Sequence, residues 1–344
     1  MAQEATGTAV SVYAESQAQT ILDGPGEHRS RGVFWWNLNI TQKLWTDADL
    51  ILNTRGGSGH GLDPLLADRA NTDWMAGEPR LAYISDVYLR QKLLDGRLTL
   101  AVGKFDVTDY FDRNEIASWN FLSYSLARNP TIPFAYHAIA GVVRYEPTEW
   151  FYAQAGVADA RGSPTESGIN TAFRHGEPFV RLCELGFRPR VQRLRGNYRI
   201  ILWHDPRSRT RIDGSGVRHG DAGIGLSFDQ QLSDKIGVFF RSGCARGEVR
   251  PTEQFWSLGA KWAGPIPGRS QDELVIGVAQ HRMGGAYRRA NDSAKAETLV
   301  ELYYTAKASE WLSVAPYLQL ILDPGARRHE DAAIAAGLRL QMRF

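Results

Sequence analysis

Apolar and polar positions alternate along most of this chain. In the terminal segment "GLRLQMRF", the even positions from Leu338 to Phe344 are apolar, whereas the odd positions hold arginine and glutamine. A period of two predicts a β-strand with one apolar face and one polar face. A soluble chain usually continues into a polar tail after its last strand, whereas this one stops on a bare phenylalanine.

About sixteen segments repeat this alternation. Each is close to the roughly 9–11 residues that a tilted strand needs to cross a bilayer. In "GVFWWNLNI", for example, Phe34, Trp36 and Leu38 share one face. We place the predicted strands at 7–15, 31–41, 43–53, 80–91, 97–105, 136–146, 149–158, 177–189, 194–204, 219–229, 236–246, 253–263, 272–282, 296–307, 311–320 and 331–344.

The connections between these strands fall into two classes. Short ones ("TQ", "LLDG", "EPTE", "QLSD" and "KASE") would lie at one end of the sheet. Long ones would lie at the other end, at 54–79, 106–135, 159–176, 205–218, 283–295 and 321–330. This asymmetry is typical of outer-membrane barrels. We predict an all-β fold, a closed transmembrane antiparallel β-barrel of about 16 strands that forms one domain over residues 1–344. Its last strand would pair with its first and leave no free edge.

The composition agrees with a barrel. Hydrophobic residues make up 43% of the chain and the mean hydropathy is −0.34. Such values suit a barrel because only every second strand residue faces lipid. No stretch approaches the roughly 18 apolar residues of a transmembrane helix. The net charge is +2 and the arginines are spread along the chain, so nucleic acid is not an expected partner.

The N-terminal segment "MAQEATG" lacks a basic region followed by an apolar core, so we expect no signal peptide. Ala2–Ala5 looks like the start of a mature exported chain behind an added Met1.

The predicted loop at about 106–135 differs from the other connections because it is long and rich in both charged and aromatic residues. We expect it to fold into the barrel lumen, where its aromatic rings would be buried and its charges would form a constriction. The alternative is an outer loop that packs on a neighbouring subunit.

Several motifs from about residue 80 onward resemble those of the carbohydrate-selective porins of the OprB type. They are "LAVGKFDVTDYFDRN", "ARNPTIPF", "GVVRYEPTEWFYAQAGVADA", "GNYRIILWH", "SFDQQLSD", "GVFFRSG", "PGRSQDELVIGVAQ", "ELYYTAKASEWLSVAPYLQLILDPG" and "GLRLQMRF". The resemblance implies a sixteen-stranded barrel with an inward loop that passes small sugars through the bacterial outer membrane. A C-terminal aromatic such as Phe344 also resembles the signal that bacterial insertion machinery reads.

A sugar that crosses such a lumen exchanges water for hydrogen bonds to charged and amide side chains and stacks on aromatic rings. Binding must stay weak for flux to continue. Trp35 is the candidate stacking platform. The other candidate selectivity residues are Asp106, Asp109, Arg113 and Asn114 in the loop and Arg144, Arg199, Arg241 and Glu301 on the inward face. The alternative is that these charges pair across the barrel and stiffen it.

Catalysis finds little support in the sequence. The eight histidines are scattered, and no GxSxG, HExxH or CxxC motif occurs. We therefore expect no catalytic site, metal or cofactor. Another function remains open: the barrel would serve as a structural or docking subunit of an envelope assembly, with or without self-association. Single-channel conductance separates the two, because a porin must conduct.

Overall fold

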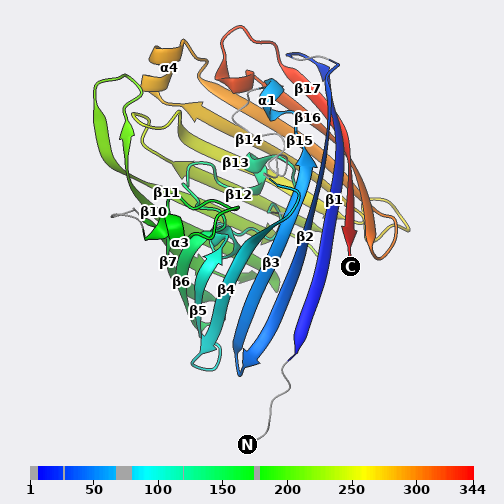
Figure 1. The fold of residues 1–344 in the computed structure, drawn as a ribbon. Helices are drawn as coiled ribbons and strands as arrows, with labels where there is room; N and C mark the ends of the chain where they lie inside the picture. The colour runs from blue at the N-terminus through cyan, green and yellow to red at the C-terminus, as the bar shows by residue number, and fades with distance from the viewer. Residues whose placement is uncertain (1–6, 26–27, 67–79, 119, 174–178) are drawn as a thin grey trace, which may run out of the picture.

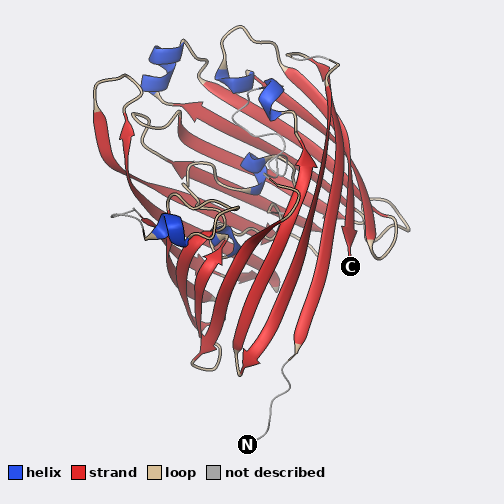
Figure 2. Ribbon diagram, in the orientation of Figure 1, coloured by secondary structure: helices blue, strands red, loops and turns tan. Residues whose placement is uncertain are grey.

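The computed structural model describes residues 7–25, 28–66, 80–118, 120–173 and 179–344; the N-terminal segment 1–6 lies outside this range. Within these residues, sixteen long strands form a closed antiparallel barrel (Figures 1 and 2). The strands are β1 (Thr8–Asp23), β2 (Ser30–Trp45), β3 (Ala48–Gly59), β4 (Tyr83–Leu93), β5 (Leu98–Phe105), β6 (Ala138–Thr148), β7 (Phe151–Asp159), β8 (Phe179–Phe187), β10 (Leu194–Thr210), β11 (Val217–Gln231), β12 (Ile236–Cys244), β13 (Thr252–Ala263), β14 (Glu273–Met283), β15 (Ala296–Lys307), β16 (Leu312–Leu322) and β17 (Ala333–Arg343). The two-residue β9 (Arg190–Val191) pairs with β10 in a turn.

The barrel closes between β1 and β17. Ser16 lies opposite Leu340, and the backbones of Val12 and Phe344 exchange two hydrogen bonds of 3.0 and 2.9 Å. β1 pairs with β2 on its other side, so no strand at this junction presents an edge. On β17, Leu338 is 42% exposed on the outer face while Arg339 is 3% exposed on the inner face. The predicted closure and the predicted face of this strand are confirmed.

Several predicted boundaries are wrong because strands continue farther than the alternation does. β2 runs on through "TQ", and the turn falls at Thr46–Asp47, where Asp47 has a φ of 58°. β10 continues to Thr210 and β11 begins at Val217, so the predicted 205–218 loop shrinks to 211–216. Beyond the apolar band, both faces of a hairpin meet water. Polar and apolar residues therefore stop alternating there, although the two backbones still pair.

The helices are short. They are α1 (Asp63–Leu66), η1 (Val107–Asp109), α2 (Tyr124–Ala127), α3 (Ile169–Ala172), α4 (Gly285–Asn291) and η2 (Pro324–Ala326). Among the described residues, none of these is long and apolar enough to span a membrane. Figure 1 shows α1 and α4 at one rim, whereas the short turns lie at the opposite rim with the N-terminus. An outer-membrane barrel places its short turns on the periplasmic side.

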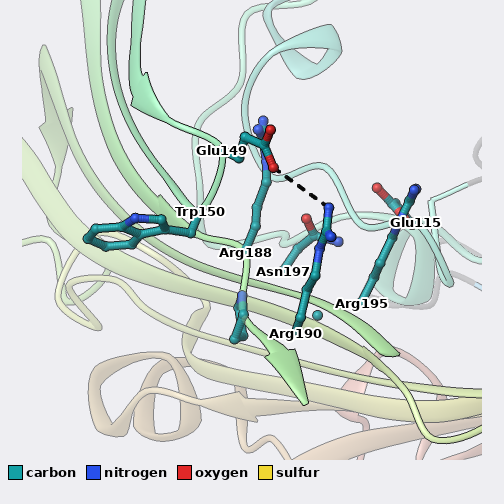
Figure 3. A pocket seen from close by; sticks show the side chains of 9 residues that line it. Glu115, Glu149, Trp150, Arg188, Arg190, Arg195 and Asn197 are labelled. Carbon is teal, nitrogen blue, oxygen red and sulfur yellow. Dashed lines mark ion pairs between the residues drawn. The ribbon is translucent and has the colours of Figure 1, made fainter. Parts of the chain in front are cut away.

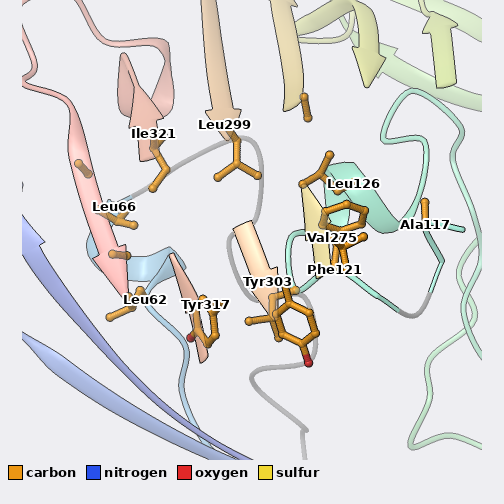
Figure 4. Close-up of a cluster of buried hydrophobic side chains, with 14 of the residues drawn as sticks. Leu62, Leu66, Ala117, Phe121, Leu126, Val275, Leu299, Tyr303, Tyr317 and Ile321 are labelled. Carbon is orange, nitrogen blue, oxygen red and sulfur yellow. The ribbon is translucent and has the colours of Figure 1, made fainter. Parts of the chain in front are cut away.

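An apolar cluster fills part of the lumen, and we call it the apolar sector. Phe121 and Leu126 of the 106–135 loop and Leu66 of α1 pack against inward side chains of β12–β17 (Figure 4). The wall residues are Phe239, Phe255, Val275, Ala279, Leu299, Tyr303, Ala315, Tyr317, Ile321, Ala333 and Ala335. Burial of apolar surface on this scale fixes the loop and α1 to one side of the barrel.

Candidate functional site

The loop between β5 and β6 lies inside the barrel, as predicted. It leaves the wall after Phe105 and rejoins it at Ala138. Between these points, Asn114 donates a hydrogen bond to the carbonyl of Phe228 on β11 (3.1 Å), and Asn129 donates to that of Ser242 on β12 (2.8 Å). The loop therefore crosses from the β5–β6 wall to the opposite wall and divides the lumen.

Two charged wall residues anchor this loop. Glu301 on β15 accepts hydrogen bonds from the backbone N–H groups of Leu122 (2.8 Å) and Ser123 (3.0 Å). Arg241 on β12 donates to the carbonyl of Leu126 (2.7 Å) and to the carboxylate of Asp112 (3.2 Å).

Both anchors are fully buried. Both side chains point inward, as their parity on the strand predicts, but the loop covers them. Their role in sugar selectivity stays a prediction.

A cavity of about 370 Å³ lies beside the first part of the loop, near the periplasmic ends of β6–β10, and we call it the arginine cavity. It brings together four predicted residues, Arg113, Asn114, Arg144 and Arg199. The other lining residues are Tyr110, Glu115, Ser118, Tyr152, Arg188 and Asn197. The cavity therefore presents several guanidinium groups and two tyrosine rings to the same space.

Carboxylates and an aromatic ring hold these arginines in place. Arg199 pairs with Asp229 at 2.8 Å, and Glu146 pairs with both Arg144 and Arg188. The guanidinium groups of Arg144 and Arg188 lie 3.8 and 4.9 Å from the ring centre of Tyr152. These contacts occupy some of each guanidinium's donors and fix the direction of the rest.

Asn114 and Arg113 owe their positions to the loop backbone. The side-chain oxygen of Asn114 accepts from the N–H groups of Ile116 (3.2 Å) and Ala117 (3.0 Å), which makes it a local cap. Arg113 donates to the carbonyl of Asp109 (3.0 Å) and is otherwise exposed. Arg113, like Glu115, is therefore an exposed loop residue at the cavity, whereas Asn114 is largely committed to structure.

A second cavity, of about 400 Å³, lies against β1–β4 and β17, and we call it the Trp35 cavity. It holds the other three predicted residues, Trp35, Asp106 and Asp109, with residues that the prediction missed. The latter are Tyr13, Asn37, Asn39, Asn53, Arg55, Asp86, His137, Arg339, Gln341 and Arg343. The loop thus separates an arginine-rich space, lined by one carboxylate, from a space lined by three, those of Asp86, Asp106 and Asp109.

The ring of Trp35 is largely covered. It is 4% exposed, lies 4.9 Å from the ring of Tyr13 and has the guanidinium of Arg55 at 5.5 Å. Its role as a stacking platform stays a prediction. Nearby, His137 is hydrogen-bonded to Asp86 (2.8 Å) and contacts Arg55 (3.0 Å).

Asp106 and Asp109 begin the loop. Asp106 caps η1 by accepting from the backbone N–H of Thr108 (2.8 Å). Burial, and then the negative charges of Asp106 and Asp86, raise the pKa of the Asp109 carboxyl to about 7. This side of the lumen therefore carries a charge that changes near neutral pH.

At the periplasmic mouth, a wider space of about 620 Å³ continues the arginine cavity, and we call it the vestibule (Figure 3). The two spaces share Glu115, Arg188 and Asn197. The vestibule adds Glu149, Trp150, Pro189, Arg190, Arg195 and Gly196. Arg190 forms an ion pair of 3.8 Å with Glu149, both of which are exposed. The two spaces therefore lie next to each other between the loop and the periplasmic end.

Parity could have found some of the missed residues. Tyr152 lies at an inward position of "FYAQAGVADA". Arg188 lies just beyond the end of β8, but within the predicted strand 177–189 it shares the parity of the inward residues Leu182 and Glu184. No group of His, Cys, Asp and Glu residues suited to a metal ion occurs in the part of the chain that the structure describes.

The family model described as "Carbohydrate-selective porin, OprB family" matches residues 74–344. Among curated proteins, Porin AaxA of Chlamydia abortus is 24% identical over 261 residues, which cover 74% of this chain and 56% of that protein. Porin AaxA of Chlamydia felis is 22% identical over 302 residues, 86% of this chain and 63% of that protein. The chain thus spans less than two-thirds of the length of these relatives.

Solved structures support the fold. The high-pH structure of Pseudomonas putida OprB matches with a TM-score of 0.87 at 19% identity, over 98% of this chain and 94% of that one. The outer-membrane channel DcaP of Acinetobacter baumannii matches with a TM-score of 0.63 at 11% identity, over 100% and 99%. At these identities, the likeness concerns the fold alone.

Proposed function

Because this chain belongs to the OprB family of carbohydrate-selective porins, we propose that it lets small sugars diffuse passively across the bacterial outer membrane. The observation that carries the proposal is the arginine cavity and its continuation into the vestibule. Its volume falls within the roughly 300–1,000 Å³ of ordinary small-molecule sites. The family and the fold point to a channel instead of an enzyme.

The chemistry of the cavity suits neutral sugars. Guanidinium groups offer planar pairs of donors to neighbouring hydroxyls, and the amide of Asn197 both donates and accepts. The ring of Tyr152 is 2% exposed beneath Arg144 and Arg188, so it positions these two arginines and offers no open face to a sugar. Because Arg144, Arg188 and Arg199 are already paired with carboxylates, a sugar gains little from its contacts with them. Such weak binding suits flux.

Arg113 offers the sharpest test. Its removal takes away a donor pair from an exposed position without breaking an anchor, so Arg113→Ala should leave ion conductance equal or higher. Saturable sugar block should weaken several-fold, as a loss of roughly 1 kcal/mol implies. The measurement is single-channel current in planar bilayers with a panel of sugars. Arg97→Ala, in the β4–β5 turn, is the matched control and should change neither quantity.

Two results would contradict the proposal. One is unchanged sugar block in Arg113→Ala. The other is a native channel that no sugar blocks and that passes no sugar in liposome-swelling assays. A barrel that does not conduct at all would favour the structural or docking role in an envelope assembly.

Partners beyond sugar and lipid belong to the same proposal. Phe344 is 68% exposed, stacks on Trp311 at 5.9 Å and pairs with β1. These features suit a terminal aromatic that the outer-membrane assembly machinery recognises. The proposal extends to self-association of barrels, which crosslinking in native membranes tests.

A further inference from the structure

A separate group of arginines lies at the outer end of the lumen, around the ends of β10 and β11 that are remote from the short turns (Figure 1). We call it the outer arginine cluster. It comprises Asp205, Arg207, Arg209, Arg211, Arg218, Asp221, Arg246, Glu248 and Arg250, and none of these lines the arginine cavity, the Trp35 cavity or the vestibule.

Two carboxylates at the base of the cluster are buried. Asp205 accepts hydrogen bonds from Arg207 (2.8 Å) and Arg209 (2.7 Å), and its side chain is fully covered. Asp221 accepts from Arg250 (2.8 Å) and has Arg246 at 3.9 Å. Both carboxylates are on the lumen face, because the lipid-facing positions Leu202 and Ile224 alternate with them.

The β12–β13 turn joins a third carboxylate to the same cluster. Glu248 pairs with Arg211 at 2.8 Å and with Arg218. It lies between Arg246 and Arg250, whose backbones are hydrogen-bonded to each other at 3.0 Å. Within the described residues, the cluster therefore holds six guanidinium groups and three carboxylates. The net charge of the cluster is positive.

Several donors in the cluster have no acceptor. Nε of Arg209, Nε of Arg218 and Nη2 of Arg250 are buried and form no hydrogen bond in the described structure. Arg250 Nη2 lies 3.5 Å from Asp205 without making one. A buried guanidinium donor that lacks an acceptor is costly, and an oxyanion supplies several acceptors at once.

The cluster is also accessible. The side chains of Arg207 and Arg209 are 30% exposed and that of Arg246 is 47% exposed. Below them, Arg250 lies over the ring of Trp203 at 5.4 Å. Burial, and then the charge of Arg209, lower the pKa of the Arg250 guanidinium.

We propose that the outer arginine cluster binds a doubly charged oxyanion, and that its ligand is the phosphate group of a small phosphorylated sugar arriving from the outer medium. Guanidinium forks match phosphate oxygens in pairs, and a dianion suits a site with several positive charges in excess. The lumen position favours a soluble ester over a lipid headgroup. The sugar part of the ligand rests on the proposed function, whereas oxyanion binding rests on the cluster alone.

The test uses the full chain folded in lipid-free detergent, with glucose 6-phosphate, inorganic phosphate and glucose as probes in calorimetry. We expect glucose 6-phosphate and phosphate to bind and glucose to bind much more weakly. Arg209→Gln/Arg246→Gln should weaken phosphate-ester binding about tenfold or more, because charge-assisted hydrogen bonds are lost. Arg327→Gln, in the β16–β17 loop, should leave binding unchanged.

Other outcomes overturn the proposal. It fails if glucose 6-phosphate binds wild-type protein no more tightly than glucose, or if the double variant binds it unchanged. It also fails if a phosphorylated glycolipid, added to the detergent as a further probe, binds while glucose 6-phosphate does not. Should the double variant not fold, Arg246→Gln alone decides, since its ion pair is the longest in the cluster. Glucose flux through the double variant should equal that of wild type. If wild-type protein passes no glucose, the sugar-porin function is refuted, whereas oxyanion binding is unaffected by that result.

Discussion

The apolar sector and the arginine cavity are built on the same loop but differ in what faces it. In the apolar sector, Phe121 and Leu126 are at most 2% exposed and interlock with wall side chains from β12–β17. In the arginine cavity, the wall offers charged side chains that are already paired, and an open space of about 370 Å³ remains. Close packing thus fixes one part of the loop. This holds the other part beside the arginines and leaves open space between them.

The largest expected effect comes from breaking the apolar sector. Phe121→Ala removes a buried ring, and a large-to-small change of this type costs about 3–5 kcal/mol. With its packing lost, the loop should no longer be held against β12–β15. Ion conductance should therefore rise several-fold and sugar block should disappear. Bilayer recordings and heat-modifiable gel migration measure the two consequences.

The matched control is Phe173→Ala, at an exposed position outside the barrel core (73% exposed). It should leave conductance and the unfolding temperature unchanged. If Phe121→Ala lowered stability but kept the native conductance and sugar block, packing in this sector would not determine the constriction.

A smaller effect on conductance is expected at the hydrogen-bonded anchor, because the apolar contacts of the loop remain in place. Glu301→Ala leaves the N–H groups of Leu122 and Ser123 without their acceptor, at about 1–3 kcal/mol for each buried group left unsatisfied. Glu301→Gln retains one carbonyl oxygen and should cost less. We expect the noise of the single-channel current to increase from wild type to Glu301→Gln, and again from Glu301→Gln to Glu301→Ala. Equal noise in all three would mean that the apolar contacts alone hold the loop.

The smallest effect concerns the opposite face of the loop. Because its pKa is raised to about 7, Asp109 is largely protonated below that pH and ionised above it. Cation preference should therefore increase modestly as pH rises through 7, as reversal potentials in a salt gradient report. Asp109→Asn should flatten this change, and Asp95→Asn in the β4–β5 turn should not. A pH response that persists in Asp109→Asn would assign it to another group.

The sequence predicts the barrel well because lipid contact imposes a period of two on every strand. It predicts the apolar sector poorly. On β14, "ELVIGVAQ" is apolar on both faces, with Val275 and Ala279 inward. A lipid-facing strand needs only one apolar face, so this doubling signals protein on the inside. The pattern cannot say which segment supplies that protein.

The candidate site shows the same limit. Parity placed Arg144, Arg199, Arg241 and Glu301 on the inner face, and all four lie there. Two of them face open space and two lie beneath the loop. The difference depends on contacts between segments more than a hundred residues apart. No local pattern encodes such contacts, so the sequence finds the inner face without separating lining residues from anchors.

The anchor at Glu301 also bears on the order in which the molecule is assembled. It joins residues 179 positions apart, so Leu122 and Ser123 gain their acceptor only after β15 has entered the sheet. The loop's other contacts, on β11 and β12, also come from later parts of the chain. Closing so long a segment is entropically costly and slow. We therefore expect the loop to dock after most of the wall has formed, so that the channel passes through a wide, unselective intermediate before it matures. Each newly inserted copy would then leak briefly, for a time that the speed of loop docking sets.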